Sequence, residues 1–148
     1  MEINGLPLHP LLVHAAVVFT PIAALTALAY ALLTRWRERL RWPMLALAVV
    51  ATLAVVAAYL SGRSFLDANP ALGERPIVGT HEERAELLLW LTIGFGVVAI
   101  LNGWLHARSG PVQVTLRVVL AVASAAVLVQ VVLTGDAGSR AVWGSISG

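Results

Sequence analysis

The sequence predicts an all-α integral membrane protein: one four-helix bundle of up-down-up-down topology that takes up residues 1–148, with both termini on the non-cytoplasmic side. Three observations support this prediction. Hydrophobic residues make up 59% of the chain and charged residues 12%, a balance foreign to soluble globular domains. Four apolar runs are each long enough to cross a bilayer. Arginines gather in a short connection between two runs, which sets the orientation of the bundle.

The first two apolar runs cover residues 11–34 and 43–61 and are expected to form one helical hairpin. The first run is not expected to be a cleaved signal, because no basic region precedes it and arginines follow it. The connection 35–42 reads Arg-Trp-Arg-Glu-Arg-Leu-Arg-Trp. Its arginines and flanking tryptophans predict a loop at the cytoplasmic face of the membrane.

The third and fourth runs cover residues 84–105 and 112–134 and form the second hairpin. Their connection carries His106 and Arg108, and Gly110-Pro111 provides its turn. This composition agrees with a second cytoplasmic loop. His106 is interpreted as a solvated residue of that loop.

Residues 62–80 then form the only sizeable external loop, and Pro70 and Pro76 argue against a buried helix there. The Thr-x-x-Glu spacing of Thr80-His81-Glu82-Glu83 is typical of a capping box, which predicts that the third helix begins at His81. The two hairpins show no convincing internal sequence repeat.

Composition also excludes several kinds of function. The chain has no cysteine, so disulfides, thiolate-held iron-sulfur clusters, covalently attached c-type haem and zinc-thiolate sites are excluded. The positive charges are all arginines, and they concentrate in one short loop instead of lining a groove. Nucleic acid is therefore not expected as a partner.

Three histidines, His9, His14 and His81, fall where the first and third spans begin, which is the same side of the membrane in this topology. Ionisable side chains are costly in a membrane helix and usually bind a ligand, carry protons or form a buried pair. His14 shares a helical stripe with Pro21 and Leu25, and a proline kink would open the backbone beside it. We therefore expect His14 to face the interior of the bundle.

The opening Gly5-Leu6-Pro7-Leu8-His9-Pro10-Leu11-Leu12-Val13-His14 resembles the start of the bacterial membrane family known as domain of unknown function 2231. The resemblance implies four spans, a histidine near the start of the third and a glycine-rich tail, here 135–144. Two departures are Ala15-Ala16, where many members have Phe-Pro, and Ser145, where many have a tail histidine. Relatives are fused to Rieske-type or cytochrome c-type domains, which implies electron transfer.

The leading hypothesis is a b-type haem held by His14 and His81 as axial ligands, with His9 as a neighbouring or alternative ligand. Two neutral imidazoles from facing helices suit a low-spin haem inside a bundle. The protein would pass single electrons between a membrane donor and an external acceptor, without a bond-making reaction.

Two alternatives remain open. In the first, His9, His14 and His81 with Glu86 or Asp136 bind copper or zinc, since imidazoles and a carboxylate suit either ion. In the second, the protein is a cofactor-free accessory subunit of a membrane redox complex.

The expected surroundings follow from the class and the resemblance. The protein is expected in the bacterial inner membrane as a multi-pass protein, in contact with lipid and with a membrane or external redox partner, and a homo-oligomer is allowed. Glu86, one turn inside the third span, is expected to pair with Arg63 or to orient a histidine.

Overall fold

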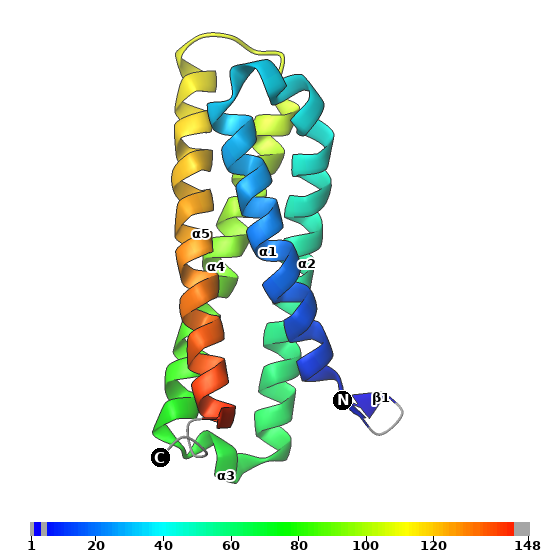
Figure 1. Ribbon diagram of the computed structural model, residues 1–148, viewed down its shortest axis with the longest axis vertical. Coiled ribbons are helices and arrows are strands. Elements are labelled where there is room, and N and C mark those ends of the chain that lie inside the picture. Colours follow the sequence, from blue (N-terminus) through cyan, green and yellow to red (C-terminus); the bar gives the residue numbers. More distant parts are fainter. Residues whose placement is uncertain (1, 4–5, 144–148) are drawn as a thin grey trace.

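Four long helices make up nearly all of the described chain (Figure 1). The computed structural model describes residues 2–3 and 6–143. All four are long and apolar enough to span a membrane, which confirms the predicted class. In order, the elements are β1 (Glu2–Ile3), β2 (Leu6–Pro7), α1 (Leu8–Leu32), the 3-10 helix η1 (Thr34–Trp36), α2 (Arg37–Ala68), α3 (Pro70–Gly73), α4 (Pro76–Trp104) and α5 (Pro111–Trp143).

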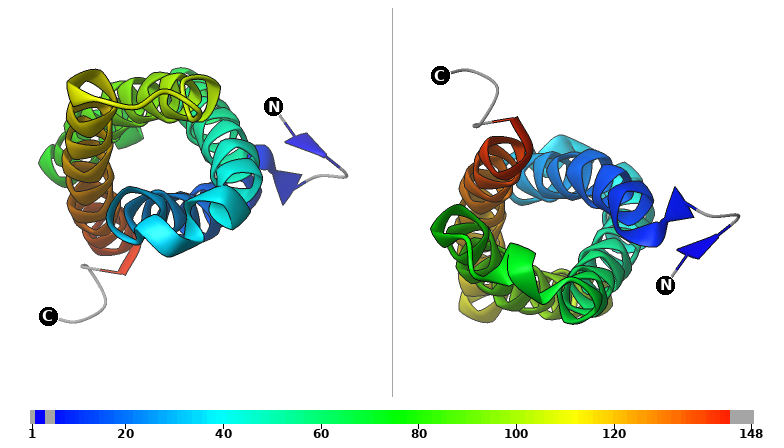
Figure 2. Two further views of the ribbon diagram at one scale, coloured as in Figure 1. Left: turned by 90° about the horizontal axis from the view of Figure 1, so that it is seen from above. Right: turned by 90° about the horizontal axis from the view of Figure 1, so that it is seen from below.

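The four long helices form a ring when the bundle is viewed along its axis (Figure 2). Both α1 and α4 pack against α2 and α5, so α1 and α4 lie diagonally opposite each other. Contacts within the hairpins α1–α2 and α4–α5 are more extensive than contacts between the hairpins. We call the end that carries α3 the α3 end, and the opposite end, which carries η1 and residues 105–110, the arginine end.

The helices at the α3 end are longer than predicted. Helix α2 continues to Ala68, and α4 begins at Pro76, before the predicted start at His81. The predicted loop 62–80 is therefore mostly helical, because prolines fit the first positions of α3 and α4 without losing a hydrogen bond. The Thr80 hydroxyl donates to the Pro76 carbonyl at 3.2 Å inside α4, so the predicted capping box is wrong.

The other two helices also differ from their apolar runs. Helix α1 spans Leu8–Leu32, about one turn earlier in the chain than predicted. Helix α5 continues from the predicted end at 134 to Trp143 and includes all but the last residue of the glycine-rich tail. Gly144 and Ser145 lie outside the described residues. Hydropathy marks the apolar part of a helix, whereas the helix itself continues into polar sequence.

Small residues form the interior of α1, and large apolar residues point outward. Ala23, Ala24 and Ala27 are fully buried, whereas Val18 is 51% exposed and Leu25 is 57% exposed. Lipid solvates a large aliphatic side chain as well as a protein core does, so the helices associate through the faces that allow the closest packing. The buried face of α1 is therefore the alanine face.

Glycines allow a similarly close approach between α4 and α2. A Cβ atom added at Gly96 would lie 2.7 Å from Thr52 Oγ1, and one added at Gly103 would lie 2.6 Å from Leu45 Cδ2. Both distances are too short for ordinary packing, so these positions need glycine where two helices meet.

The two hairpins bury equivalent faces. Every buried residue of α1 has a buried counterpart 72 positions later in α4, and every buried residue of α2 has one 76 positions later in α5. The repeat is one of burial: most of the paired residues differ in type, which agrees with the lack of a convincing sequence repeat. The pairs are Ala16 with Leu88, Thr20 with Thr92, Ala23 with Phe95, Ala24 with Gly96, Ala27 with Ala99, Tyr30 with Asn102, Ala31 with Gly103, Met44 with Leu120, Ala48 with Ser124, Ala51 with Val127, Val55 with Val131, Ala58 with Thr134, and Ser61 with Ala137.

Two contacts between equivalent residues show where the pseudo-two-fold axis runs. The Tyr30 hydroxyl donates to the carbonyl oxygen of its counterpart Asn102 at 3.1 Å. In the amide orientation that satisfies both partners, Gln113 Oε1 accepts from Nη2 of its counterpart Arg37 at 2.7 Å. Residues related by a two-fold rotation meet only near its axis. The axis therefore runs along the centre of the ring and relates one hairpin to the other.

Candidate functional site

Two imidazoles occupy equivalent positions at the α3 end. His9 lies on α1 and His81 lies on α4, 72 positions later, which is the spacing of the internal repeat. A positive charge on His81 would disfavour a positive charge on His9. Because α1 and α4 are diagonal in the ring, this pair flanks the axis of the bundle.

Each imidazole is held by a carbonyl group of the next helix in its own hairpin. His9 Nδ1 lies 3.1 Å from the Ala58 carbonyl oxygen and 3.1 Å from Ser61 Oγ, both on α2. His81 Nδ1 lies 3.2 Å from the Thr134 carbonyl oxygen on α5. Ala58 and Thr134 are themselves counterparts in the repeat, so the two histidines are anchored in the same way.

A glycine lies against each ring. A Cβ added at Gly62 would lie 2.9 Å from His9 Cε1, and one added at Gly138 would lie 3.0 Å from His81 Cε1. These glycines are again 76 positions apart. They leave the rings room to lie directly on the neighbouring backbone. The Phe65 ring stacks on His9 with a centroid distance of 6.4 Å.

The anchoring determines which ring nitrogen is available. A carbonyl oxygen only accepts hydrogen bonds, so Nδ1 of each imidazole carries the proton that it donates. No described residue is hydrogen-bonded to Nε2 of His9 or His81. A neutral imidazole with Nδ1 bound to a carbonyl presents the Nε2 lone pair to a metal, which is the usual arrangement of a histidine ligand.

The prediction for His14 is wrong, because this side chain is exposed on the outer surface of α1. Its Nδ1 donates to the Pro10 carbonyl of the same helix at 2.6 Å. His14 lies on the side of Val18 and Leu25, and the buried face is that of Ala16 and its neighbours. The pair formed at this end is therefore His9 with His81, and His9 takes the place predicted for His14.

The predicted copper or zinc site is not formed. Over residues 2–3 and 6–143, no three histidine or acidic side chains gather closely enough to hold a metal ion. His14 and Glu86, which are counterparts in the repeat, both point away from the bundle. Asp136, the other carboxylate considered, accepts from Nε of Arg140 one turn later on α5, at 2.9 and 3.0 Å.

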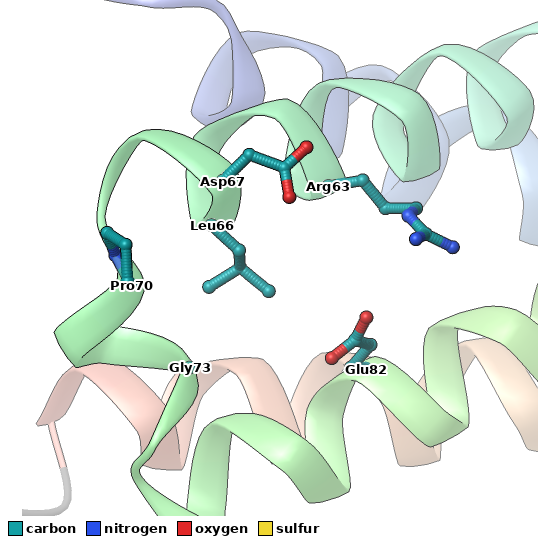
Figure 3. Close-up of a pocket in the computed structure, with 6 residues that line it drawn as sticks. All are labelled: Arg63, Leu66, Asp67, Pro70, Gly73 and Glu82. Carbon is teal, nitrogen blue, oxygen red and sulfur yellow. The ribbon is translucent and has the colours of Figure 1, made fainter.

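A cavity of about 380 Å³ opens at the α3 end and is lined by residues of α2, α3 and α4 (Figure 3). Arg63 and Asp67 from α2 and Glu82 from α4 point toward it. Arg63 interacts electrostatically with both carboxylates and lies 3.5 Å from the Tyr59 hydroxyl. Arg63 forms no ion pair with Glu86 among the described residues, and its hydrogen-bond contact is with Tyr59 of its own helix.

A second polar cluster, at the arginine end, was missed by sequence reasoning. His106 Nδ1 lies 2.9 Å from the hydroxyl of fully buried Tyr30, and His106 Nε2 forms an ion pair with Glu38 at 2.6 Å. The His106 side chain is only 11% exposed, so its interpretation as a solvated loop residue is wrong. Asn102 joins the cluster through the bond from Tyr30, and its Nδ2 donates to Leu116 O at 3.0 Å. These contacts tie all four long helices together.

Replacing Tyr30 by phenylalanine is expected to destabilise the protein by about 1–2 kcal/mol, because His106 Nδ1 and the Asn102 carbonyl both lose a partner in a nearly dry site. The free energy of unfolding can be measured by far-ultraviolet circular dichroism as dodecyl sulfate is added to mixed micelles. The control is Tyr59→Phe, whose hydroxyl has one long contact, to Arg63, and which should change the free energy by less than about 0.5 kcal/mol. Equal losses in the two variants would contradict the structural role of the cluster.

Comparison with known proteins gives one match. No curated protein and no solved structure matches the chain. A family model described as a predicted membrane protein, DUF2231, matches residues 5–146, which is nearly the whole chain and includes both histidines of the pair. With four apolar helices in the structure, the chain therefore belongs to this family of multi-pass membrane proteins.

Proposed function

We propose that this protein is a membrane electron carrier in which His9 and His81 would hold a b-type haem. The observation that carries the proposal is the equivalent anchoring of the two imidazoles. Each donates its Nδ1 proton to a carbonyl of the neighbouring helix and keeps Nε2 without a protein partner. A low-spin haem requires two such ligands on opposite faces.

The two histidines of the pair suit a b-type haem. A haem with two axial imidazoles takes only two ligands from the protein, so a cluster of three ligating side chains is not needed. The Ala58 and Thr134 carbonyls would fix the orientation of the rings and raise the basicity of Nε2. When bound, the haem would supply one-electron redox chemistry. The chain itself would bind the macrocycle, orient the two ligands and exclude lipid from the iron.

The proposed setting is the bacterial inner membrane, with an electron donor in the membrane and an acceptor at the α3 end. In this setting the α3 end faces outward, because the arginine end carries most of the arginines. The exposed Asp67 and Glu82 around the cavity would meet the acceptor first.

The visible spectrum of the purified protein tests the proposal. Protein extracted in mild detergent should show a Soret band and, on reduction, a sharp α band, with about one iron per chain, as expected for a low-spin haem with two imidazole ligands. The same sample would be incubated with haemin to fill any empty sites. A protein that stays colourless after incubation and contains no iron would overturn the proposal and favour a cofactor-free accessory subunit.

The contact between Gly138 and His81 supplies a second test. Gly138→Val should displace the imidazole and reduce haem occupancy at least about 10-fold, since a change that misplaces a ligand typically costs 10- to 100-fold in affinity. Gly135→Val is the matched control, because a Cβ at this position, one turn earlier on α5, has no neighbour within 4 Å. Equal occupancy in both variants would show that His81 is not a ligand.

A further inference from the structure

Two guanidinium groups at the arginine end, far from the histidine pair, each have one buried donor that lacks a partner among the described residues. Arg37 begins α2, and Arg117 lies in the second turn of α5. The Nε atom of each is buried and has no hydrogen-bond partner among the described residues. Gln113 connects the two, since it accepts from Arg37 Nη2 at 2.7 Å and precedes Arg117 by one helical turn.

The nearby charges do not neutralise these two guanidinium groups. Glu38 is the only acidic residue at this end, and His106 already binds it at 2.6 Å. Two other arginines, Arg35 and Arg39, rest on the Trp36 ring and add further positive charge. An arginine side chain stays protonated, so its positive charge here is not neutralised. A buried N–H donor without an acceptor also costs free energy. A bound anion would neutralise the charge and accept the hydrogen bond.

Two helix N-termini at the same end strengthen the positive potential. Helix α2 begins at Arg37 without a side-chain cap; Glu38 lies in its first turn, and the Arg37 amide donates to the Thr34 carbonyl of η1. The first turn of α5 has no acidic residue. The helix dipole favours a negative charge at both places. The arginines and the helix termini therefore both favour a negatively charged ligand.

We propose that Arg37 and Arg117 bind a phosphate group, with Gln113 holding the Arg37 guanidinium in position. A phosphate offers several acceptor oxygens to the planar fork of N–H donors in each guanidinium, which a halide does not. The group lies at the end of the membrane spans, where lipid headgroups are found. The phosphate can therefore come from an anionic lipid or from a soluble phosphate, and the chemistry of the site is the same for both.

Thermal unfolding of the full-length protein in mild detergent tests the site and identifies the source. Inorganic phosphate is compared with chloride at equal ionic strength, and micelles with phosphatidylglycerol are compared with micelles with phosphatidylcholine. The proposal expects a rise in Tm of about 4 °C from at least one of the two phosphate sources. A rise with phosphatidylglycerol alone identifies a lipid headgroup, and a rise with both identifies the phosphate group itself. No rise with either source overturns the proposal.

Arg117→Gln separates ligand binding from a structural role. Arg117 loses no described partner on substitution, so the variant should keep or raise the Tm measured in chloride and phosphatidylcholine, while the rise given by phosphate is lost. Arg39→Gln is the control: its side chain is exposed and rests on Trp36, and the rise should be unchanged. An Arg117→Gln protein that keeps the full rise, or a control that loses it, would overturn the assignment of these residues.

Discussion

Replacing either His9 or His81 by alanine should abolish the haem absorbance of the purified protein. On the proposed haem site, each variant would remove one of the two ligating imidazoles and leave the other hairpin intact. Losing a residue that orients a ligand already costs 10- to 100-fold in metal affinity, and losing the ligand itself should cost at least about 100-fold. The Soret band per milligram of protein, together with iron content, measures the loss. Because the internal repeat makes the two sites equivalent, the two variants should behave alike.

His14→Ala is the matched control for this result. His14 lies one turn further along α1 than Pro10, is exposed, and bonds only within its own helix. Its removal should leave the spectrum unchanged. The reverse pattern, a lost band in His14→Ala and a normal band in His9→Ala, would restore the ligand pair that the sequence predicted. Normal bands in both His9→Ala and His81→Ala would place any haem elsewhere.

Gly96→Ala should lower the free energy of unfolding by about 1–3 kcal/mol, which is the usual effect of overpacking a well-packed interior. The new methyl group would lie 2.7 Å from Thr52 Oγ1. The Thr52 side chain cannot move freely, because its hydroxyl donates to Ala48 O at 2.8 Å and lies 3.4 Å from Thr92 O. Helices α2 and α4 would therefore have to move apart. Unfolding by dodecyl sulfate in mixed micelles, followed by circular dichroism, measures the change.

Gly94→Ala separates packing from helix propensity. Gly94 lies on the same helix, and a Cβ there has no neighbour within 4 Å. Alanine should be neutral at Gly94 or stabilise the protein by up to about 1 kcal/mol, since alanine favours the helix. The double variant Gly96→Ala with Thr52→Ala should recover part of the lost free energy of unfolding, because it removes the Thr52 hydroxyl that the new methyl group would contact. Similar results at Gly94 and Gly96 would contradict the close approach of α2 and α4.

The class of the protein and its four spans could be predicted because they depend only on the length and composition of apolar runs. Helix ends could not be predicted in this way. Hydropathy falls where a helix leaves the bilayer, but α2 continues to Ala68 and α5 to Trp143 through polar sequence. In the sequence Pro76 argues against a buried helix, whereas in the structure it occupies the first turn of α4, where proline is well tolerated.

The candidate site was predicted in part. The end of the bundle and two of its histidines, His9 and His81, were identified, but the wrong histidine of α1 was placed inside. The prediction followed the stripe that contains Pro21 and Leu25. In a membrane bundle the stripe of small residues, which contains Ala16 and Ala23, is the better guide to the buried face.

The arginine-end cluster depends on contacts between residues far apart in the chain, so no local pattern reveals it. Tyr30 and His106 meet only because the two hairpins pack together, and each looks ordinary in its own stretch of sequence. The internal repeat is hidden in the sequence for a related reason: most of the paired residues differ in type, and only their burial is shared.

A fused pair of hairpins can do something that two identical subunits cannot, which is to place different groups on the two sides of one axis. In a symmetric dimer Arg37 would face another arginine, and the two would repel. Here Arg37 faces Gln113, whose Oε1 accepts a hydrogen bond from Arg37 Nη2. Tyr30 likewise meets Asn102. At the α3 end the two halves instead carry the same side chain, His9 on α1 and His81 on α4. The arginine end is thus asymmetric in its side chains, and the α3 end presents two equal imidazole donors.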